Sequence, residues 1–182
     1  QSIAVKAEAL LGMVRKDAVD LVRGQEVIYI YHNVVDKSGH SETDVFAACE
    51  NAIEQIKSLV RKIKNNLSGV RIVITADHGF LYTQSELAES DKVAKSISKA
   101  QTVESSDRYI IAEKSAADDM LMSVKFTPAP DEFNAFTPRE NIRISRRGGT
   151  PKFIHGGASL QETIIPVLEF NSVREDSAAF KS

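Results

Sequence analysis

The chain has 182 residues, of which 42% are hydrophobic, so it is long enough to form one domain with a substantial core. Its 23 basic and 25 acidic residues leave a net charge of −2, which excludes nucleic-acid binding by bulk positive charge. A single cysteine excludes a disulfide framework, and no apolar run approaches the ~20 residues of a membrane helix. Without a signal peptide, and beginning at Gln1, the chain is expected to be a piece of a longer cytoplasmic protein with no membrane contact.

The first half of the chain predicts a helix followed by a strand–helix–strand unit. Apolar residues recur at helical spacing over 3–22, and Gly24 is a suitable helix end. Residues 27–31 and 70–75 are apolar on both faces, which is typical of parallel strands covered by helices on both sides. A helix over 42–66, capped by Ser41, connects them. These elements predict a three-layer α/β/α fold with a mostly parallel sheet.

The second half predicts shorter elements. Residues 83–106 are polar and indicate a surface segment with a partial helix. Strands are expected over 108–112, 120–126 and 164–170, a short helix from Ser159, and a flexible tail over 173–182. Residues 127–151 contain four of the five prolines and are expected to be an ordered loop around a short strand at 141–145.

All four histidines lie in or beside turns that follow predicted strands. Asp36 and His40 follow the first strand, Asp77 and His78 follow the second, and His155 lies in a later turn. In an open α/β sheet, ligands gather at the carboxyl ends of the strands. Since imidazole and carboxylate groups bind Zn²⁺ and similar ions, these turns predict a metal centre.

Each turn also has a simpler interpretation. An Asp-His-Gly sequence such as 77–79 is a common strand-end turn, and Gly156 and Gly157 can merely permit a tight bend. His32, at the end of the first strand, is interpreted as a structural hydrogen-bonding residue rather than a ligand. The occurrence of three such turns at strand ends favours the metal interpretation.

Three of these segments resemble the PglZ family, which belongs to the alkaline phosphatase superfamily and includes components of BREX bacteriophage-resistance systems. They are residues 29–36 (YIYHNVVD), 74–82 (ITADHGFLY) and 155–162 (HGGASLQE). The resemblance covers residues 1–172, which are identified as the C-terminal part of an alkaline phosphatase-like domain. It implies an α/β fold of that type.

The resemblance also implies a set of site residues. One metal would be held by Asp36, His40 and His155, and a second in part by Asp77 and His78. The metals would be divalent, zinc or manganese, with two sites in the full-length protein. The resemblance places the Ser or Thr nucleophile upstream of Gln1, outside this chain.

A basic segment precedes His155. Residues 139–152 contain five basic side chains and one acidic side chain, and Arg143, Arg146 and Arg147 are among the basic ones. Because guanidinium groups bind phosphate bidentately, we hypothesise that these three arginines hold a substrate phosphate. The alternative is a solvated loop that adds solubility.

The expected function is that of a metal-dependent phosphatase or phosphodiesterase-like component of a BREX phage-defence system. Its substrate would be a nucleotide, a nucleic acid or a phosphorylated signal, and its partners other defence proteins. The rival hypothesis is a non-catalytic scaffold of the defence complex, with a vestigial or structural metal site. A third hypothesis is an effector domain of a signalling protein with the same family fold.

Overall fold

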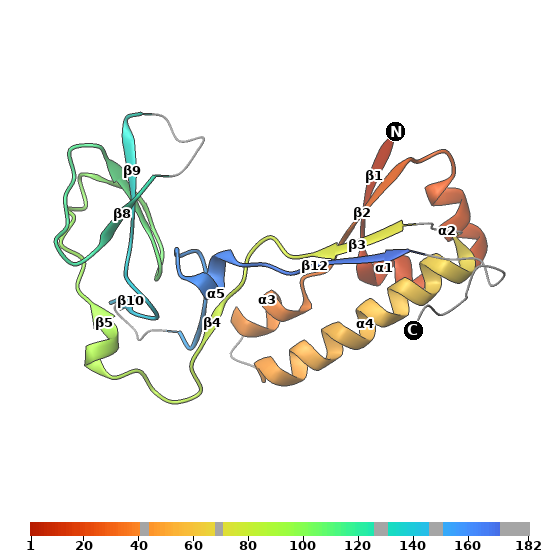
Figure 1. Cartoon of the computed structure of the whole chain (residues 1–182), viewed down its shortest axis with the longest axis horizontal. Helices are drawn as coiled ribbons and strands as arrows, with labels where there is room; N and C mark the ends of the chain where they lie inside the picture. Colours follow the sequence, from red (N-terminus) through yellow and green to blue (C-terminus); the bar gives the residue numbers. More distant parts are fainter. Residues whose placement is uncertain (41–43, 68–70, 126–130, 146–150, 172–182) are drawn as a thin grey trace, which may run out of the picture. The chain divides into compact units, whose positions relative to one another are not determined.

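The computed structural model describes residues 1–40, 44–67, 71–125, 131–145 and 151–171 (Figure 1). Its contacts divide the chain into two compact units. Unit 1 comprises Gln1–Thr75 and the chain from Val167 onward, and unit 2 comprises Ala76–Pro166. No helix in the described ranges is long and apolar enough to cross a membrane.

In its described residues, unit 1 contains two ladders and four helices. Strand β1 (Ser2–Lys6) pairs in parallel with β2 (Val27–Tyr31), and β3 (Arg71–Thr75) pairs antiparallel with β12 (Val167–Asn171). The helices are α1 (Ala7–Gly12), α2 (Arg15–Val22), α3 (Val34–His40) and α4 (Val45–Asn66) (Figure 1). A hydrophobic core joins β1, β2 and helices α1, α2 and α4 through the buried residues Ala7, Leu10, Ala18 and Leu59, with Val5, Leu11, Met13, Ile30 and Leu67 packed against them.

Strands β2 and β3 are covered on one face only, contrary to the expectation of burial on both faces. Tyr29 and Tyr31 of β2 are 58% and 68% exposed, and Val73 of β3 is 52% exposed. Exposed and partly buried residues alternate along both strands. This two-residue period is that of a sheet with one covered face. The predicted strand–helix–strand order is present, but β2 and β3 belong to separate ladders in the described part of the chain.

The start of the chain differs from the helix predicted over 3–22. Residues 2–6 form β1, because alternating Ile3 and Val5 also fit a strand and the parallel partner β2 supplies the backbone hydrogen bonds. The remaining helix is broken, since Met13 and Val14 are extended. As predicted, Gly24 follows the end of α2, with a φ of +74°.

Helix α4 matches the predicted second helix from residue 45 onward. Its N-cap is Asp44, whose carboxylate accepts from the amides of Phe46 and Ala47 at 3.0 and 3.2 Å. The expected cap, Ser41, lies outside the described residues. Helix α3 was not predicted, because the Asp, Ser and Gly residues over 36–39 suggested a turn.

Unit 2 is built around a four-stranded antiparallel sheet in the order β6–β7–β9–β8. These strands are β6 (Thr102–Ser105), β7 (Ile110–Glu113), β8 (Met122–Val124) and β9 (Phe133–Thr137). Short elements complete it: β4 (Leu81–Tyr82), η1 (Glu89–Asp91), β5 (Lys92–Val93), β10 (Arg143–Ile144), β11 (Phe153–Ile154) and α5 (Leu160–Thr163). Its core contains Val93, Ile97, Ile110, Ala112, Ala116, Leu121, Phe136 and Ile144.

The predicted strands over 108–112, 120–126 and 141–145 correspond to β7, β8 and β10, although Phe126 is outside the described residues. Strand β9 was missed, because it lies inside the proline-rich segment that was expected to be loop.

The chain therefore has an α/β fold. Among the pairings of the described residues, β1–β2 and β5–β10 are parallel and the other five are antiparallel. The mostly parallel, three-layer arrangement is not confirmed by these pairings and stays a prediction.

Candidate metal centre

Two of the predicted ligands, His78 and His155, lie side by side in unit 2. His78 is in the turn after β3, and His155 directly follows β11. Their rings stack with centroids 4.0 Å apart and planes 11° from parallel, and a ring nitrogen of each lies within 4.8 Å of the other. Imidazole nitrogens at this spacing could bind one divalent ion, since Zn–N bonds are ~2.0–2.1 Å long.

The hydrogen bond of His78 orients its ring. Its Nδ1 lies 3.0 Å from the carbonyl oxygen of Gly79, and since a carbonyl only accepts, Nδ1 carries the proton. In the neutral imidazole the lone pair is then on Nε2, which lies 3.8 Å from a carboxylate oxygen of the exposed Asp77. A nitrogen lone pair and a carboxylate that face one another at this distance suit a cation between them.

The His78 turn is held by a close backbone approach at Gly79. The Gly79 amide donates to the carbonyl of Glu162 at 2.9 Å. A Cβ atom at residue 79 would lie 2.0 Å from the carbonyl oxygen of Gln161, which no side chain could tolerate without backbone movement. Glycine is therefore required here by space.

The His155 turn contains two further constrained glycines. Gly156 has a φ of +100°, a conformation that residues with a side chain rarely adopt, and it packs against the ring of Tyr109. The Gly157 amide donates to Glu162 Oε1 at 2.9 Å, and a Cβ at Gly157 would lie 2.7 Å from Glu162 Oε2. Both glycines thus permit the turn that carries His155.

A buried ion pair lies directly behind the two turns. Arg108 and Glu162 are 0% and 3% exposed, and they form two hydrogen bonds, Nε to Oε1 at 3.0 Å and Nη2 to Oε2 at 2.7 Å. Burial alone would raise the pKa of Glu162, but hydrogen bonds from Arg108, Ser159 and Gly157 hold that pKa below its usual value. Sequence reasoning missed this pair, since the two residues are 54 positions apart.

The other predicted ligands are placed as follows. Asp36 is half-buried on α3 in unit 1. His40 ends the same helix four residues later, a spacing that puts two residues on one helix face, although its side chain lies outside the described part. His32 Nε2 lies 2.9 Å from Gln55 Oε1, which supports its interpretation as a structural residue. The expected ligands thus come from both units.

The predicted phosphate-binding arginines differ from expectation. Arg143 is fully buried in unit 2, where its guanidinium donates to Thr83 Oγ1 at 2.8 Å and to the backbone carbonyl of Asn141. Burial lowers its pKa, with Arg108 adding repulsion. These contacts favour a structural role for Arg143 over contact with a substrate. Arg146 and Arg147 lie outside the described residues.

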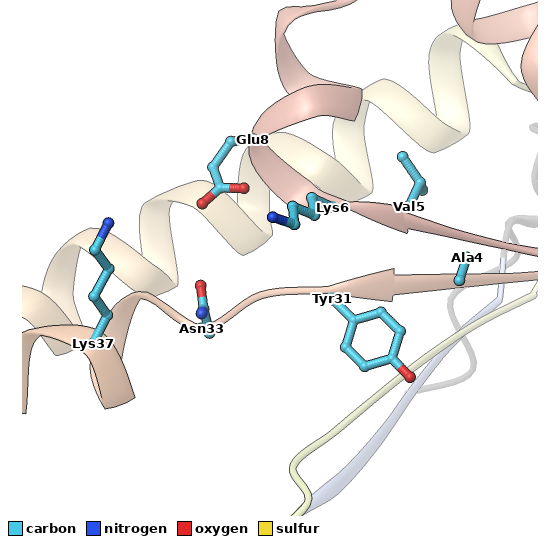
Figure 2. Close-up of a pocket in the computed structure, with 7 residues that line it drawn as sticks. All are labelled: Ala4, Val5, Lys6, Glu8, Tyr31, Asn33 and Lys37. Atoms are coloured by element: carbon cyan, nitrogen blue, oxygen red, sulfur yellow. The ribbon is translucent and has the colours of Figure 1, made fainter.

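Unit 1 contains a pocket that the sequence did not indicate. It lies at the carboxyl ends of the parallel strands β1 and β2 and has a volume of about 460 Å³. Figure 2 shows its polar side chains, Lys6, Glu8, Tyr31, Asn33 and Lys37. Two ammonium groups against one carboxylate give the pocket a net positive charge, which suits an anionic ligand.

Comparison with known proteins identifies clear relatives. Residues 1–170 match the family model of the BREX system PglZ alkaline phosphatase-like domain. The chain is 35% identical to the alkaline phosphatase-like protein BrxZ of Escherichia coli O9:H4 (strain HS), over 98% of this chain and 21% of that protein. It is 36% identical to the alkaline phosphatase-like protein PglZ of Bacillus cereus (strain H3081.97), over 97% of this chain and 21% of that protein. The chain thus spans about a fifth of the length of these relatives.

Proposed function

The chain belongs to the PglZ family of alkaline phosphatase-like domains, and from that membership we propose that it forms part of a metal-dependent phosphoric-ester hydrolase of a BREX system. The observation that carries the proposal is the stacked pair His78 and His155, whose ring nitrogens lie within 4.8 Å of one another, close enough to belong to one metal centre. The activity would be that of a phosphatase or phosphodiesterase. Its substrate would be a nucleotide, a nucleic acid or a phosphorylated signal in the cytoplasm.

The proposed ligands are those expected from the resemblance. Asp36, His40 and His155 would hold one divalent metal, and Asp77 and His78 would contribute to a second. Nitrogen and oxygen donors suit zinc, with manganese as the alternative. Such ions polarise a phosphoryl group and stabilise the leaving oxygen. The 3.8 Å approach of His78 Nε2 to the Asp77 carboxylate supports the second site.

Metal analysis of the full-length protein tests this proposal. After dialysis without chelator, mass spectrometry should find bound zinc or manganese in the wild type. The Asp36→Ala and His155→Ala variants should lose metal, whereas His32→Ala should keep it, because His32 is bonded to Gln55. A metal-free wild type, or a His155→Ala variant with full metal content, would exclude the proposed site.

We also propose that the pocket of unit 1 receives the anionic part of the substrate. Lys37 directly follows the proposed ligand Asp36, and Lys6 lines the same hollow. With bis-p-nitrophenyl phosphate as the probe, Lys6→Gln and Lys37→Gln in the full-length protein should raise KM with little change in kcat. Lys16→Gln, an exposed position on α2, is the matched control. An unchanged KM in both pocket variants would remove this role.

The exposed face of strands β2 and β3 in unit 1 favours a second candidate function, that of a scaffold. Tyr29, Tyr31 and Val73 present aromatic and aliphatic surface that soluble domains usually cover. Helices from the rest of the full-length protein on this face would give the three-layer fold expected of the family. If another BREX protein binds there instead, this chain acts as a scaffold. Hydrogen exchange of β2 in the full-length protein, alone and with its BREX partners, separates these cases.

A further inference from the structure

One residue, Glu162, bonds to both of the turns that carry the histidine pair. Its backbone carbonyl accepts from the amide of Gly79, the residue after His78, at 2.9 Å. Its carboxylate accepts from the amide of Gly157, two residues after His155, also at 2.9 Å. The two histidines are far apart in the sequence, so Glu162 provides a direct hydrogen-bonded link between their turns.

The carboxylate of Glu162 is itself held in one orientation. Arg108 binds both of its oxygens, and Ser159 donates to Oε2 from its hydroxyl at 2.6 Å and from its amide at 3.3 Å. The Arg108 guanidinium also donates to the backbone carbonyls of Glu140 and Ile142. A bidentate pair with this many further bonds leaves the carboxylate no freedom to rotate.

We infer that Arg108 and Glu162 are positioning residues of the metal centre, which hold the turns of His78 and His155, proposed ligands of its two ions, at a fixed separation. The inference rests on the metal site proposed above. Neither residue is among the proposed ligands. Their effect is exerted through the backbone of Gly79 and Gly157. Removing a group that orients metal ligands typically changes metal affinity by ~10–100-fold.

A purely structural ion pair would stabilise unit 2 without affecting the metal geometry, so the test must separate stability from positioning. Glu162→Gln keeps the backbone carbonyl and the size of the side chain, but removes the charge that Arg108 binds. Asp118→Ala is the matched control in the same unit. It removes an acceptor for the amides of Ser96, Met120 and Leu121, none of which lies in a histidine turn.

The experiment uses the full-length protein loaded with Co²⁺, whose visible spectrum reports ligand geometry, and measures Zn²⁺ affinity by competition with a chromophoric chelator. Glu162→Gln should weaken Zn²⁺ binding by about 10–100-fold and change the Co²⁺ spectrum. Asp118→Ala should change neither, even where its unfolding free energy falls as far. If Glu162→Gln does not fold, Ser159→Ala removes one bond to Oε2 and should weaken binding about two- to tenfold.

Three outcomes would overturn the inference, and they are distinguishable. Wild-type affinity and spectrum in the folded Glu162→Gln variant would show that the pair is only structural. Equal weakening in Asp118→Ala would show that general stability controls metal binding. A wild-type protein that binds neither Zn²⁺ nor Co²⁺ would remove the proposed metal site, and the positioning role with it.

Discussion

Gly79→Ala is the substitution that most directly tests how the His78 turn is built. The added Cβ would lie 2.0 Å from the Gln161 carbonyl oxygen, about 1.4 Å inside the ordinary contact distance of 3.4 Å. The Gln161 carbonyl oxygen is a backbone atom, and the position of a Cβ atom is fixed by its own backbone. No side-chain rotation can therefore remove the overlap. The turn must therefore move away from α5, to which Gln161 belongs.

That movement has two energetic consequences. It breaks the 2.9 Å hydrogen bond from the Gly79 amide to Glu162, and loss of a bond to a buried partner costs about 1–3 kcal/mol. Residual overpacking adds about 1–3 kcal/mol. We therefore expect unit 2 to lose about 2–6 kcal/mol of unfolding free energy, a large part of the ~5–15 kcal/mol typical of a domain.

Hydrogen exchange measured by mass spectrometry on unit 2 peptides of the full-length protein gives this quantity directly. Gly12→Ala, on α1 of unit 1, is the control that should leave the exchange of unit 2 peptides unchanged, since Gly12 is exposed with nothing within 4 Å of an added Cβ. Alanine there should be neutral or stabilising by about 0.5–1 kcal/mol. If Gly79→Ala exchanges as slowly as the wild type, the close approach is not a constraint and the argument for the turn fails.

Three further predictions concern single groups. The pKa of Glu162 is lowered from its ordinary value of 4.5, so its stabilisation of unit 2 is complete above pH 4.5 and is lost as the pH falls through the lowered value. Acid unfolding of unit 2 should therefore begin below pH 4.5, and Glu162→Gln should remove this contribution to the pH dependence. Lys62→Met removes the ammonium group that donates to the carbonyls of Leu11 and Met13. It should destabilise unit 1 by about 1–3 kcal/mol in urea unfolding. An unchanged midpoint would show that water replaces the ammonium group as the donor. Asp44→Ala removes the N-cap of α4 and should lower the unfolding free energy of unit 1 by about 1 kcal/mol, with faster amide exchange confined to the first turn of the helix. Asp44→Asn retains a capping oxygen and should recover most of that free energy.

The sequence was informative wherever periodicity and local chemistry agree. Strand β2, helix α4 and strand β3 were predicted because long apolar runs with clear turn signals leave few alternatives. Strand β1 was not, because Ile3 and Val5 fit both a helical and a strand period, and the parallel partner β2 decides between them. Strand β9 is likewise fixed by pairing with β7 and β8 inside a segment rich in prolines.

In the candidate site too, residues with a local sequence signal were predicted, and residues joined by long-range contacts were not. His78 and His155 were selected from sequence because each lies in a turn with glycine, and the structure brings their rings together. Glu162 was visible only as part of a motif, and Arg108 only as the start of a strand. No local pattern reports a bond between residues 54 positions apart, so their pairing had to be found in the structure.

The pairing of β3 with β12 sets an order of events during synthesis. Thr75 and Val167 are direct partners in this ladder, and roughly 90 residues of unit 2 lie between them. During synthesis on the ribosome, β3 cannot pair with β12 until all of unit 2 has been translated. Unit 2 can therefore fold first, and by bringing its own ends together it would lower the loop-closure entropy of the last ladder of unit 1. Slow translation within 76–166 would prolong the time during which β3 exposes an unpaired edge, which makes this interval the one most open to misassembly.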